Sequence, residues 1–144
     1  MRKNAIAYDQ LYALLRPAVW HKTVLEVATG TAGGKASLCS ADHIEATDSS
    51  TAMIAQAKRG NFSSKLHFSV QDMFHLPYAD QSFDVVIVSN ALHIVPHPEK
   101  ALTELRRVLK NDGTLIAPTF THAENSPWGK LQALVLKIAA FRCT

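Results

Sequence analysis

Residues 24–34 read VLEVATGTAGG, and this stretch decides the fold. Apolar residues surround Glu26 and then give way to small residues and glycines, the pattern of a buried parallel strand that ends in a tight loop before a helix. In an open parallel sheet, ligands bind beyond the carboxyl ends of the strands, where unpaired backbone N–H groups can hold a polar group. Gly30 lets the backbone turn and approach a ligand, and the side chains of Ala28 and Ala32 are small enough to leave room for it. We therefore expect a ligand at this loop.

Length and composition describe one folded domain. The chain has 144 residues, enough to bury roughly two thirds of its unfolded surface. A hydrophobic content of 47% and a charged content of 19% exclude a disordered chain. The formal net charge is only +3, and the basic residues form no stripe interleaved with aromatic residues. The expected partners therefore do not include nucleic acid.

The cysteines and the apolar runs indicate the compartment. Cys39 and Cys143 form no CxxC or zinc-spaced set, so reduced structural thiols are expected. No signal-peptide pattern precedes Tyr8. The long apolar run from Leu131 to Phe141 is interrupted by Lys137 and is too short to cross a bilayer. The sequence thus predicts a cytoplasmic protein without a membrane span.

Strand patterns and helix patterns alternate along the chain. An amphipathic helix is expected over Ala5–Leu15, ended by Pro17, so that residues 1–20 form a lid and residues 21–144 a single core. Strands are expected over Thr23–Thr29, His43–Thr47, Leu66–Val70, Phe83–Ser89 and Thr114–Phe120. Further helices are expected over Gly33–Ser40, Thr51–Arg59 and Pro98–Asn111, with a last one after Ser126 that carries Leu131, Leu134, Val135 and Ile138 as one stripe.

This alternation predicts a Rossmann-like, doubly wound α/β sheet of about five parallel strands with helices on both faces. The strand over Phe83–Ser89 is the most apolar of the first hundred residues, so both of its faces should be covered. Ser49 or Ser50 can cap the helix expected over Thr51–Arg59, whose inward-facing residues would be Met53, Ile54 and Ala57. The carboxyl ends of the first four strands then form a single cleft.

The order of these signals resembles the class I S-adenosylmethionine-dependent methyltransferases, in particular the small-molecule group related to quinone biosynthesis. The resemblance covers nearly the whole chain, and it rests on four features. These are VLEVATGTAG at 24–33, Asp48 after the second strand, QDMFHLPYADQSFDVVIVSNALHIV at 71–95 and LTELRRVLKNDGTLIAPTF at 102–120. The resemblance implies methyl transfer from S-adenosylmethionine to a small-molecule acceptor, with S-adenosylhomocysteine as the product.

The resemblance also implies roles for residues at the cleft. The Gly30 loop would cradle the methionine part of the cofactor, Asp48 would accept hydrogen bonds from the ribose diol, and Asp72 would accept one from the adenine amino group. Met53 or Ile54 would cover one face of the adenine, and Met73 or Phe74 the other. The residues implied to bind the cofactor are Glu26, Ala28, Thr29, Gly30, Thr31, Asp48, Ser49, Met53, Asp72, Met73 and Asn90.

Methyl transfer from a sulfonium needs mainly alignment of the two reactants, so no obligatory catalytic motif is expected. Tyr8 on the lid could place its ring or hydroxyl near the sulfonium, the alternative being that it only packs the helix. His93 could act as a general base, the alternative being a structural histidine. His93 and His97 have HxxxH spacing, but Pro96 and Pro98 break the helix that a metal site would need, so no metal is expected.

Two departures from the family pattern bear on function. The family loop carries three glycines at alternate positions, whereas this chain has Ala28, Gly30 and Ala32. A Cβ at a position that needs positive φ costs about 1 kcal/mol. An alternative to the enzyme is therefore a weakly binding or inactive cofactor-binding or interaction module. A dinucleotide-binding protein is disfavoured, because its fingerprint needs glycines where Ala32 and Lys35 stand.

The second departure concerns the carboxyl-terminal edge of the sheet. The family sheet continues with two further strands after the last helix, and these are expected to be missing here. The strand over Thr114–Phe120 would then have an exposed edge, which invites pairing with another chain. The sequence favours a truncated chain, and a homo-oligomer formed through this edge is the alternative.

Overall fold

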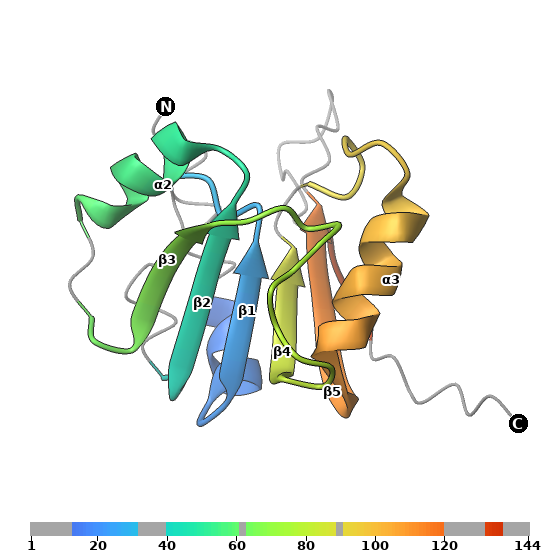
Figure 1. The fold of residues 1–144 in the computed structure, drawn as a ribbon. Helices are drawn as coiled ribbons and strands as arrows, with labels where there is room; N and C mark the ends of the chain where they lie inside the picture. Colours follow the sequence, from blue (N-terminus) through green and yellow to red (C-terminus); the bar gives the residue numbers. More distant parts are fainter. Residues whose placement is uncertain (1–12, 32–39, 61–62, 89–90, 120–131, 137–144) are drawn as a thin grey trace, which may run out of the picture.

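The computed structural model describes residues 13–31, 40–60, 63–88, 91–119 and 132–136. Its centre is a six-stranded sheet in the order β3-β2-β1-β4-β5-β6 (Figure 1). The strands are β1 Thr23–Val27, β2 His43–Asp48, β3 Leu66–Val70, β4 Phe83–Val88, β5 Leu109–Thr119 and β6 Gln132–Leu136. Strands β1 to β5 run parallel, and β6 pairs with β5 in the antiparallel sense. The predicted doubly wound parallel sheet is confirmed.

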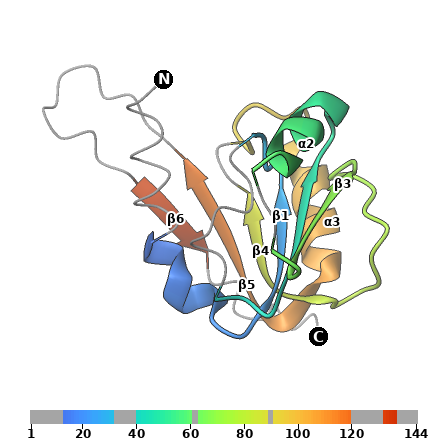
Figure 2. The same ribbon diagram turned by 90° about the vertical axis from the view of Figure 1, so that its left-hand side faces the viewer.

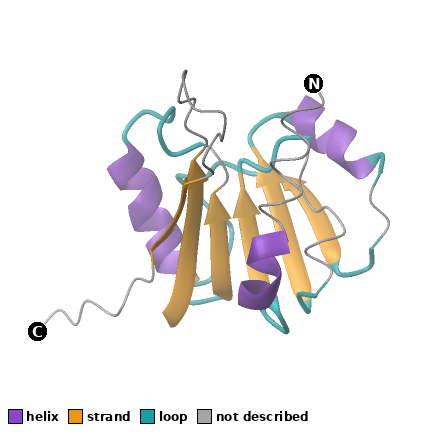
Figure 3. Ribbon diagram, turned by 180° about the vertical axis from the view of Figure 1, so that it is seen from behind, coloured by secondary structure: helices purple, strands orange, loops and turns teal. Residues whose placement is uncertain are grey.

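Alternate residues of the central strands pack on opposite faces of the sheet. The helical residues 13–19 cover one face, and α3, over Pro98–Val108, covers the other (Figures 2 and 3). The apolar cluster under residues 13–19 includes Leu15, Val19, Val24, Val85 and Ile87. The apolar cluster under α3 includes Leu25, Val86, Val88, Leu105 and Val108. Strand β4 is therefore covered on both faces, as its unbroken apolar run predicts.

The amino-terminal helix does not end where the sequence predicts. Residues 13–19 are helical, so Pro17 lies inside the helix rather than beyond its end. Leu15 and Val19, four residues apart, are 4% and 0% exposed against the sheet. Burial of this pair outweighs the one hydrogen bond that Pro17 cannot donate. Residues 1–12, with Tyr8, and most of the predicted helix over Gly33–Ser40 lie outside the described residues.

Helix α2, over Thr51–Lys58, begins as predicted. The Ser50 hydroxyl accepts a hydrogen bond from the Met53 backbone N–H at 3.3 Å, which makes Ser50 the N-cap. Ile54 and Ala57 are buried, whereas Met53 is 42% exposed. The prediction that Met53 faces inward is therefore wrong, because only one narrow stripe of this short helix packs on the sheet.

The sheet does not end at β5. A helical stripe containing Leu134 and Val135 was expected, but both residues belong to strand β6, with Ile116 paired to Val135. Pairing with β6 satisfies the backbone groups along the edge of β5, which a helix could not do. The predicted exposed edge of β5 is therefore wrong, and of the two later strands that were expected to be missing, one antiparallel strand is present. The oligomer was argued from that exposed edge and loses its support. The predicted cap at Ser126 lies outside the described residues.

Strand β5 begins earlier than predicted, directly at the end of α3. Its pairing with β4 shifts from Phe83↔Leu109 to Val85↔Thr114, two residues along β4 against five along β5. The Asn-Asp-Gly sequence before Thr114, expected to lie between the helix and the strand, thus forms a bulged start of the strand.

Gly113 should tolerate no side chain at this bulge. A Cβ added there would lie 2.6 Å from Leu109 Cδ1 and 2.9 Å from the Lys110 carbonyl oxygen. We expect Gly113→Ala to lower the free energy of unfolding by about 2–3 kcal/mol, because the backbone must move. Urea unfolding measures this, with Gly60→Ala as the control, since a Cβ at Gly60 meets no atom within 4 Å. Equal effects of the two substitutions would contradict the tight bulge.

Candidate functional site

A pocket of about 230 Å³ lies beyond the carboxyl ends of β1, β2 and β3, where the sequence predicts a ligand. Its lining is mostly contributed by the first residues after each strand. The lining residues are Val27, Ala28, Thr47, Asp48, Ser49, Gln71, Asp72, Met73, Phe74, Val95 and Pro96. Five of the predicted cofactor-binding residues are thus brought together here, namely Ala28, Asp48, Ser49, Asp72 and Met73.

The loop after β1 contains two residues in the left-handed region. Ala28 has φ +52° and Gly30 has φ +58°. The Thr29 N–H between them donates to the Thr47 carbonyl at 3.0 Å, which fixes the loop to the end of β2. The prediction that a Cβ stands where the backbone needs positive φ is therefore confirmed for Ala28, while Ala32 lies outside the described residues. Ala28 carries a strain of about 1–2 kcal/mol that glycine would avoid.

Asp48 joins three elements of the site. Its Oδ2 accepts the Gly30 N–H at 2.9 Å, and its Oδ1 accepts the Ser50 N–H at 2.9 Å. Its backbone carbonyl accepts the Gln71 N–H at 3.0 Å. The carboxylate therefore holds the β1 loop and the start of α2 together. Each oxygen keeps a further lone pair for a ligand, since an ionised carboxylate has about four acceptor positions.

The pocket is also lined by a turn that starts at Asp72. The Phe74 N–H donates to Asp72 Oδ1 at 2.9 Å, and the His75 N–H donates to the Asp72 carbonyl at 3.0 Å. His75 Nδ1 lies 3.6 Å from Asp72 Oδ2. Met73 and Phe74 line the pocket between these anchors. The turn therefore presents a carboxylate and two large apolar side chains to a ligand.

Several predicted residues lie elsewhere. Glu26 is fully buried within β1, Thr29 is 5% exposed, and Thr31 is exposed; none of the three lines the pocket. His93 is exposed in the turn that precedes Val95 and Pro96, and it does not line the pocket. Met53 and Ile54 also lie outside the lining, and Asn90 and Tyr8 lie outside the described residues.

Sequence reasoning missed part of the lining. Thr47 is the next-to-last residue of β2 and Gln71 follows β3 directly, so their position at the carboxyl ends of parallel strands could have found them. No local signal marks Val95 and Pro96, which reach the pocket by the path of the chain after β4. Within the part of the chain that the structure describes, no helix is long and apolar enough to cross a membrane.

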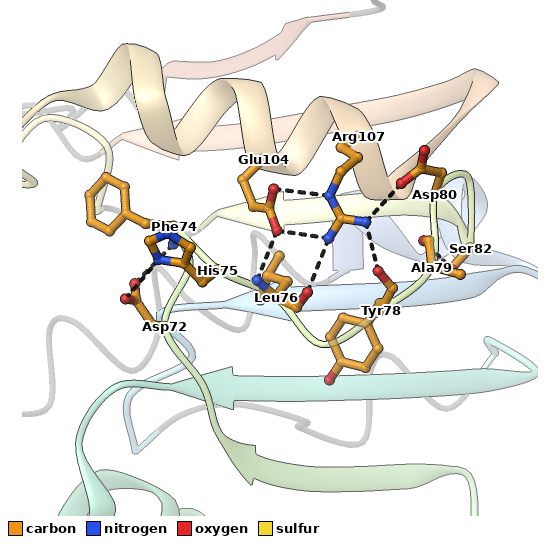
Figure 4. Close-up of polar contacts among 10 residues, drawn as sticks. All are labelled: Asp72, Phe74, His75, Leu76, Tyr78, Ala79, Asp80, Ser82, Glu104 and Arg107. Atoms are coloured by element: carbon orange, nitrogen blue, oxygen red, sulfur yellow. Dashed lines mark hydrogen bonds and ion pairs between the residues drawn. The ribbon is translucent and has the colours of Figure 1, made fainter.

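The segment from Leu76 to Asp80 is held by the polar face of α3 (Figure 4). Arg107 Nε and Nη2 donate to the two Glu104 oxygens at 3.0 and 2.7 Å. Arg107 Nη1 donates to the Tyr78 carbonyl at 2.8 Å and to Asp80 Oδ1 at 2.9 Å, and Nη2 donates to the Leu76 carbonyl at 3.0 Å. Glu104 Oε1 also accepts the Leu76 N–H at 2.8 Å. All five N–H donors of the guanidinium are thus used.

This network should make the free energy of unfolding depend on pH in acid. Hydrogen bonds from Arg107 lower the pKa of Glu104 from 4.5 to about 2. Stability from the depressed pKa is complete above pH 4.5 and is lost as the pH falls toward 2, because the unfolded chain then binds the proton first. After solvent screening we expect about 1 kcal/mol. Urea unfolding of wild type and Glu104→Gln at pH 6 and pH 3 should show their difference shrinking in acid; an unchanged difference would contradict it.

Comparison with known proteins places this arrangement in a family. A family model described as "Methyltransferase domain" matches residues 25–117. The demethylmenaquinone methyltransferase of Renibacterium salmoninarum is 37% identical over 112 residues, which are 77% of this chain and 46% of that protein. An S-adenosylmethionine-dependent methyltransferase of Mesorhizobium loti shares the fold, with a TM-score of 0.68 at 17% identity over 90% of this chain and 63% of that chain. The [4+2]-cyclase SpnF has a TM-score of 0.65 at 28% identity, and the match covers 84% of this chain and 47% of that chain.

The fold is therefore that of the class I S-adenosylmethionine-dependent methyltransferases, and the resemblance inferred from the sequence is confirmed. The chain belongs to the methyltransferase domain family. It spans about half the length of the curated relatives it matches, 46% and 45% for two of them.

Proposed function

We propose that the chain binds S-adenosylmethionine in the pocket beyond β1, β2 and β3 and directs its methyl group to a small molecule. The observation that carries this proposal is the double role of Asp48. Its carboxylate fixes the loop after β1 through Gly30 and still lines the pocket with acceptor positions left over. A ligand with a pair of neighbouring hydroxyls matches that acceptor set.

The lining fits the nucleoside half of the cofactor. A volume of about 230 Å³ is smaller than the roughly 300–1,000 Å³ of pockets that enclose a whole small molecule. Asp48 would accept the ribose hydroxyls, and Asp72 would accept the adenine amino group. Met73 and Phe74 line the same side of the pocket and would pack on the adenine ring. The loop from Ala28 to Thr31 would hold the methionine half.

The bound cofactor would supply an electrophilic methyl group on a sulfonium, so the protein has to orient the acceptor and remove its proton. We assign proton removal to His93, which is exposed in the turn that follows β4 and precedes the lining residues Val95 and Pro96. Tyr8 would stand near the sulfonium, where an aromatic face favours a cation. Glu26, Ser49, Met53 and Asn90 remain assigned to cofactor binding.

The expected acceptor is a quinone-type small molecule, acted on in the cytoplasm. This assignment rests on the similarity to curated relatives named demethylmenaquinone methyltransferase. The exposed Ile94, at 71%, and the half-buried Val95 next to His93 would contact an apolar acceptor.

The second candidate is a cofactor-binding or interaction module without turnover. The strained Ala28 favours it, because its Cβ stands at the pocket where the family pattern has glycine. The similarity to a protein named a cyclase adds that this fold also carries other chemistry.

Isothermal titration of S-adenosylmethionine and S-adenosylhomocysteine into the purified chain tests the proposal. We expect micromolar dissociation constants that Asp48→Ala and Asp72→Ala abolish. No binding at millimolar concentration to the folded chain would overturn the proposal. Binding without methyl transfer to a demethylated menaquinone analogue, in a mass-spectrometric assay, would favour the module.

A further inference from the structure

The turn at Asp72 lies at the start of a segment that contains no helix or strand. Residues 71–82 run from the carboxyl end of β3 to the start of β4, the full length of the sheet, and contain only turns and the isolated Asp72↔His75 bridge. The backbone groups of such a segment need partners from elsewhere. Figure 4 shows that Arg107 and Glu104 of α3 point toward it.

The anchor point lies two residues beyond the pocket lining. Leu76 is held at both backbone groups, its N–H by Glu104 at 2.8 Å and its carbonyl by Arg107 at 3.0 Å. Its side chain is 6% exposed in the apolar cluster. Phe74, which lines the pocket, is tied to Asp72 within the same turn. A displacement of Leu76 therefore displaces the turn as a unit.

Only a guanidinium meets the geometry of this site. Five N–H donors in one plane reach five acceptors on a carboxylate, two carbonyls and Asp80. The Glu104 side chain is 17% exposed and accepts from both Arg107 and Leu76. Lysine at this position would keep the charge but could serve three acceptors at most, without the fork.

We infer that Arg107 and Glu104 are positioning residues for the pocket, setting the place of the Asp72 turn and through it the affinity for the nucleoside half of the ligand. This inference rests on the proposed function. Neither side chain lines the pocket, so both act through the backbone of Leu76.

The test compares Arg107→Lys with Arg106→Lys. Arg106 is the neighbouring arginine of α3, but its guanidinium donates to the Leu109 carbonyl and to Asn111 Oδ1. Titration of S-adenosylhomocysteine should give a dissociation constant about tenfold higher for Arg107→Lys and within about twofold of wild type for Arg106→Lys. The affinity of Arg107→Lys for adenosine alone should fall by the same factor as its affinity for S-adenosylhomocysteine. Equal dissociation constants for the two folded variants would overturn the inference.

Amide hydrogen exchange without ligand separates this inference from the proposed function. Arg107→Lys and Glu104→Gln should speed exchange at Phe74, His75 and Leu76 at least about tenfold, with the amides of β1 and β4 unchanged. If wild type binds no ligand, the proposed function fails, and this local exchange still decides whether the pair positions the turn. Exchange that rises uniformly, or not at all, would overturn the inference.

Discussion

Replacing Asp48 by alanine should abolish ligand binding and also destabilise the free chain. The two backbone N–H groups that its carboxylate accepts, from Gly30 and Ser50, would lose their partner, and each hydrogen bond to a charged acceptor contributes about 1.5–3 kcal/mol. Because water can reach part of this site, we expect about 2–4 kcal/mol in urea unfolding. Loss of the acceptors and of the loop together should raise the dissociation constant of S-adenosylhomocysteine by a factor of about 100 or more.

Asp48→Asn is the matched control for this experiment. The amide keeps one acceptor oxygen and places an NH2 group against one of the two backbone donors. The free energy of unfolding and the dissociation constant of Asp48→Asn should therefore both lie between those of wild type and of Asp48→Ala. Wild-type affinity in Asp48→Ala, in a folded protein, would show that this carboxylate neither holds the loop nor contacts the ligand.

Replacing Ala28 by valine should be the most damaging small change at the pocket. The residue has φ +52° and lines the pocket, so a β-branched side chain adds backbone strain and fills space that the ligand needs. We expect the free energy of unfolding to fall by about 1–3 kcal/mol in urea. Titration should show a dissociation constant for S-adenosylhomocysteine at least about 100-fold higher than that of wild type.

Ala28→Gly is the opposite change at the same position. Glycine removes a strain of about 1–2 kcal/mol but gives the unfolded chain about 0.4–1 kcal/mol of extra entropy, so stability should stay level or rise by about 1 kcal/mol. Affinity should stay equal or improve. Weaker binding by the glycine variant than by wild type would show that the alanine methyl group contacts the ligand favourably.

The sheet and five residues of the pocket lining could be predicted, because parallel strands ending in polar or small residues are a local pattern. Asp48 is the last residue of β2 and Asp72 lies two residues beyond the end of β3, and the pocket lies where such strand ends meet. The left-handed conformation of Ala28 follows from the spacing of small residues. The hydrogen bonds of Asp48 to Gly30 and of Arg107 to Leu76 could not be predicted, since they join residues 18 and 31 positions apart.

The two clear errors at the ends of the fold have a common cause. Leu134 and Val135 fit a helical stripe as well as a strand, and the backbone groups along the edge of β5 decide between the two. Pro17 ends a helix by local rules, yet Val19 still packs in the core. In both cases a tertiary contact outweighs the local preference.

The anchoring of the Asp72 turn by α3 sets an order of events during synthesis. Leu76 leaves the ribosome 31 residues before Arg107, a delay of about 2–6 s at the usual rate of translation. In that interval β1, β2, β3 and the Asp72 turn have been made, while the helix that fixes the turn has not. We therefore expect the nascent domain to acquire ligand affinity only after α3 docks, so that the cofactor stabilises the finished domain and takes no part in its assembly.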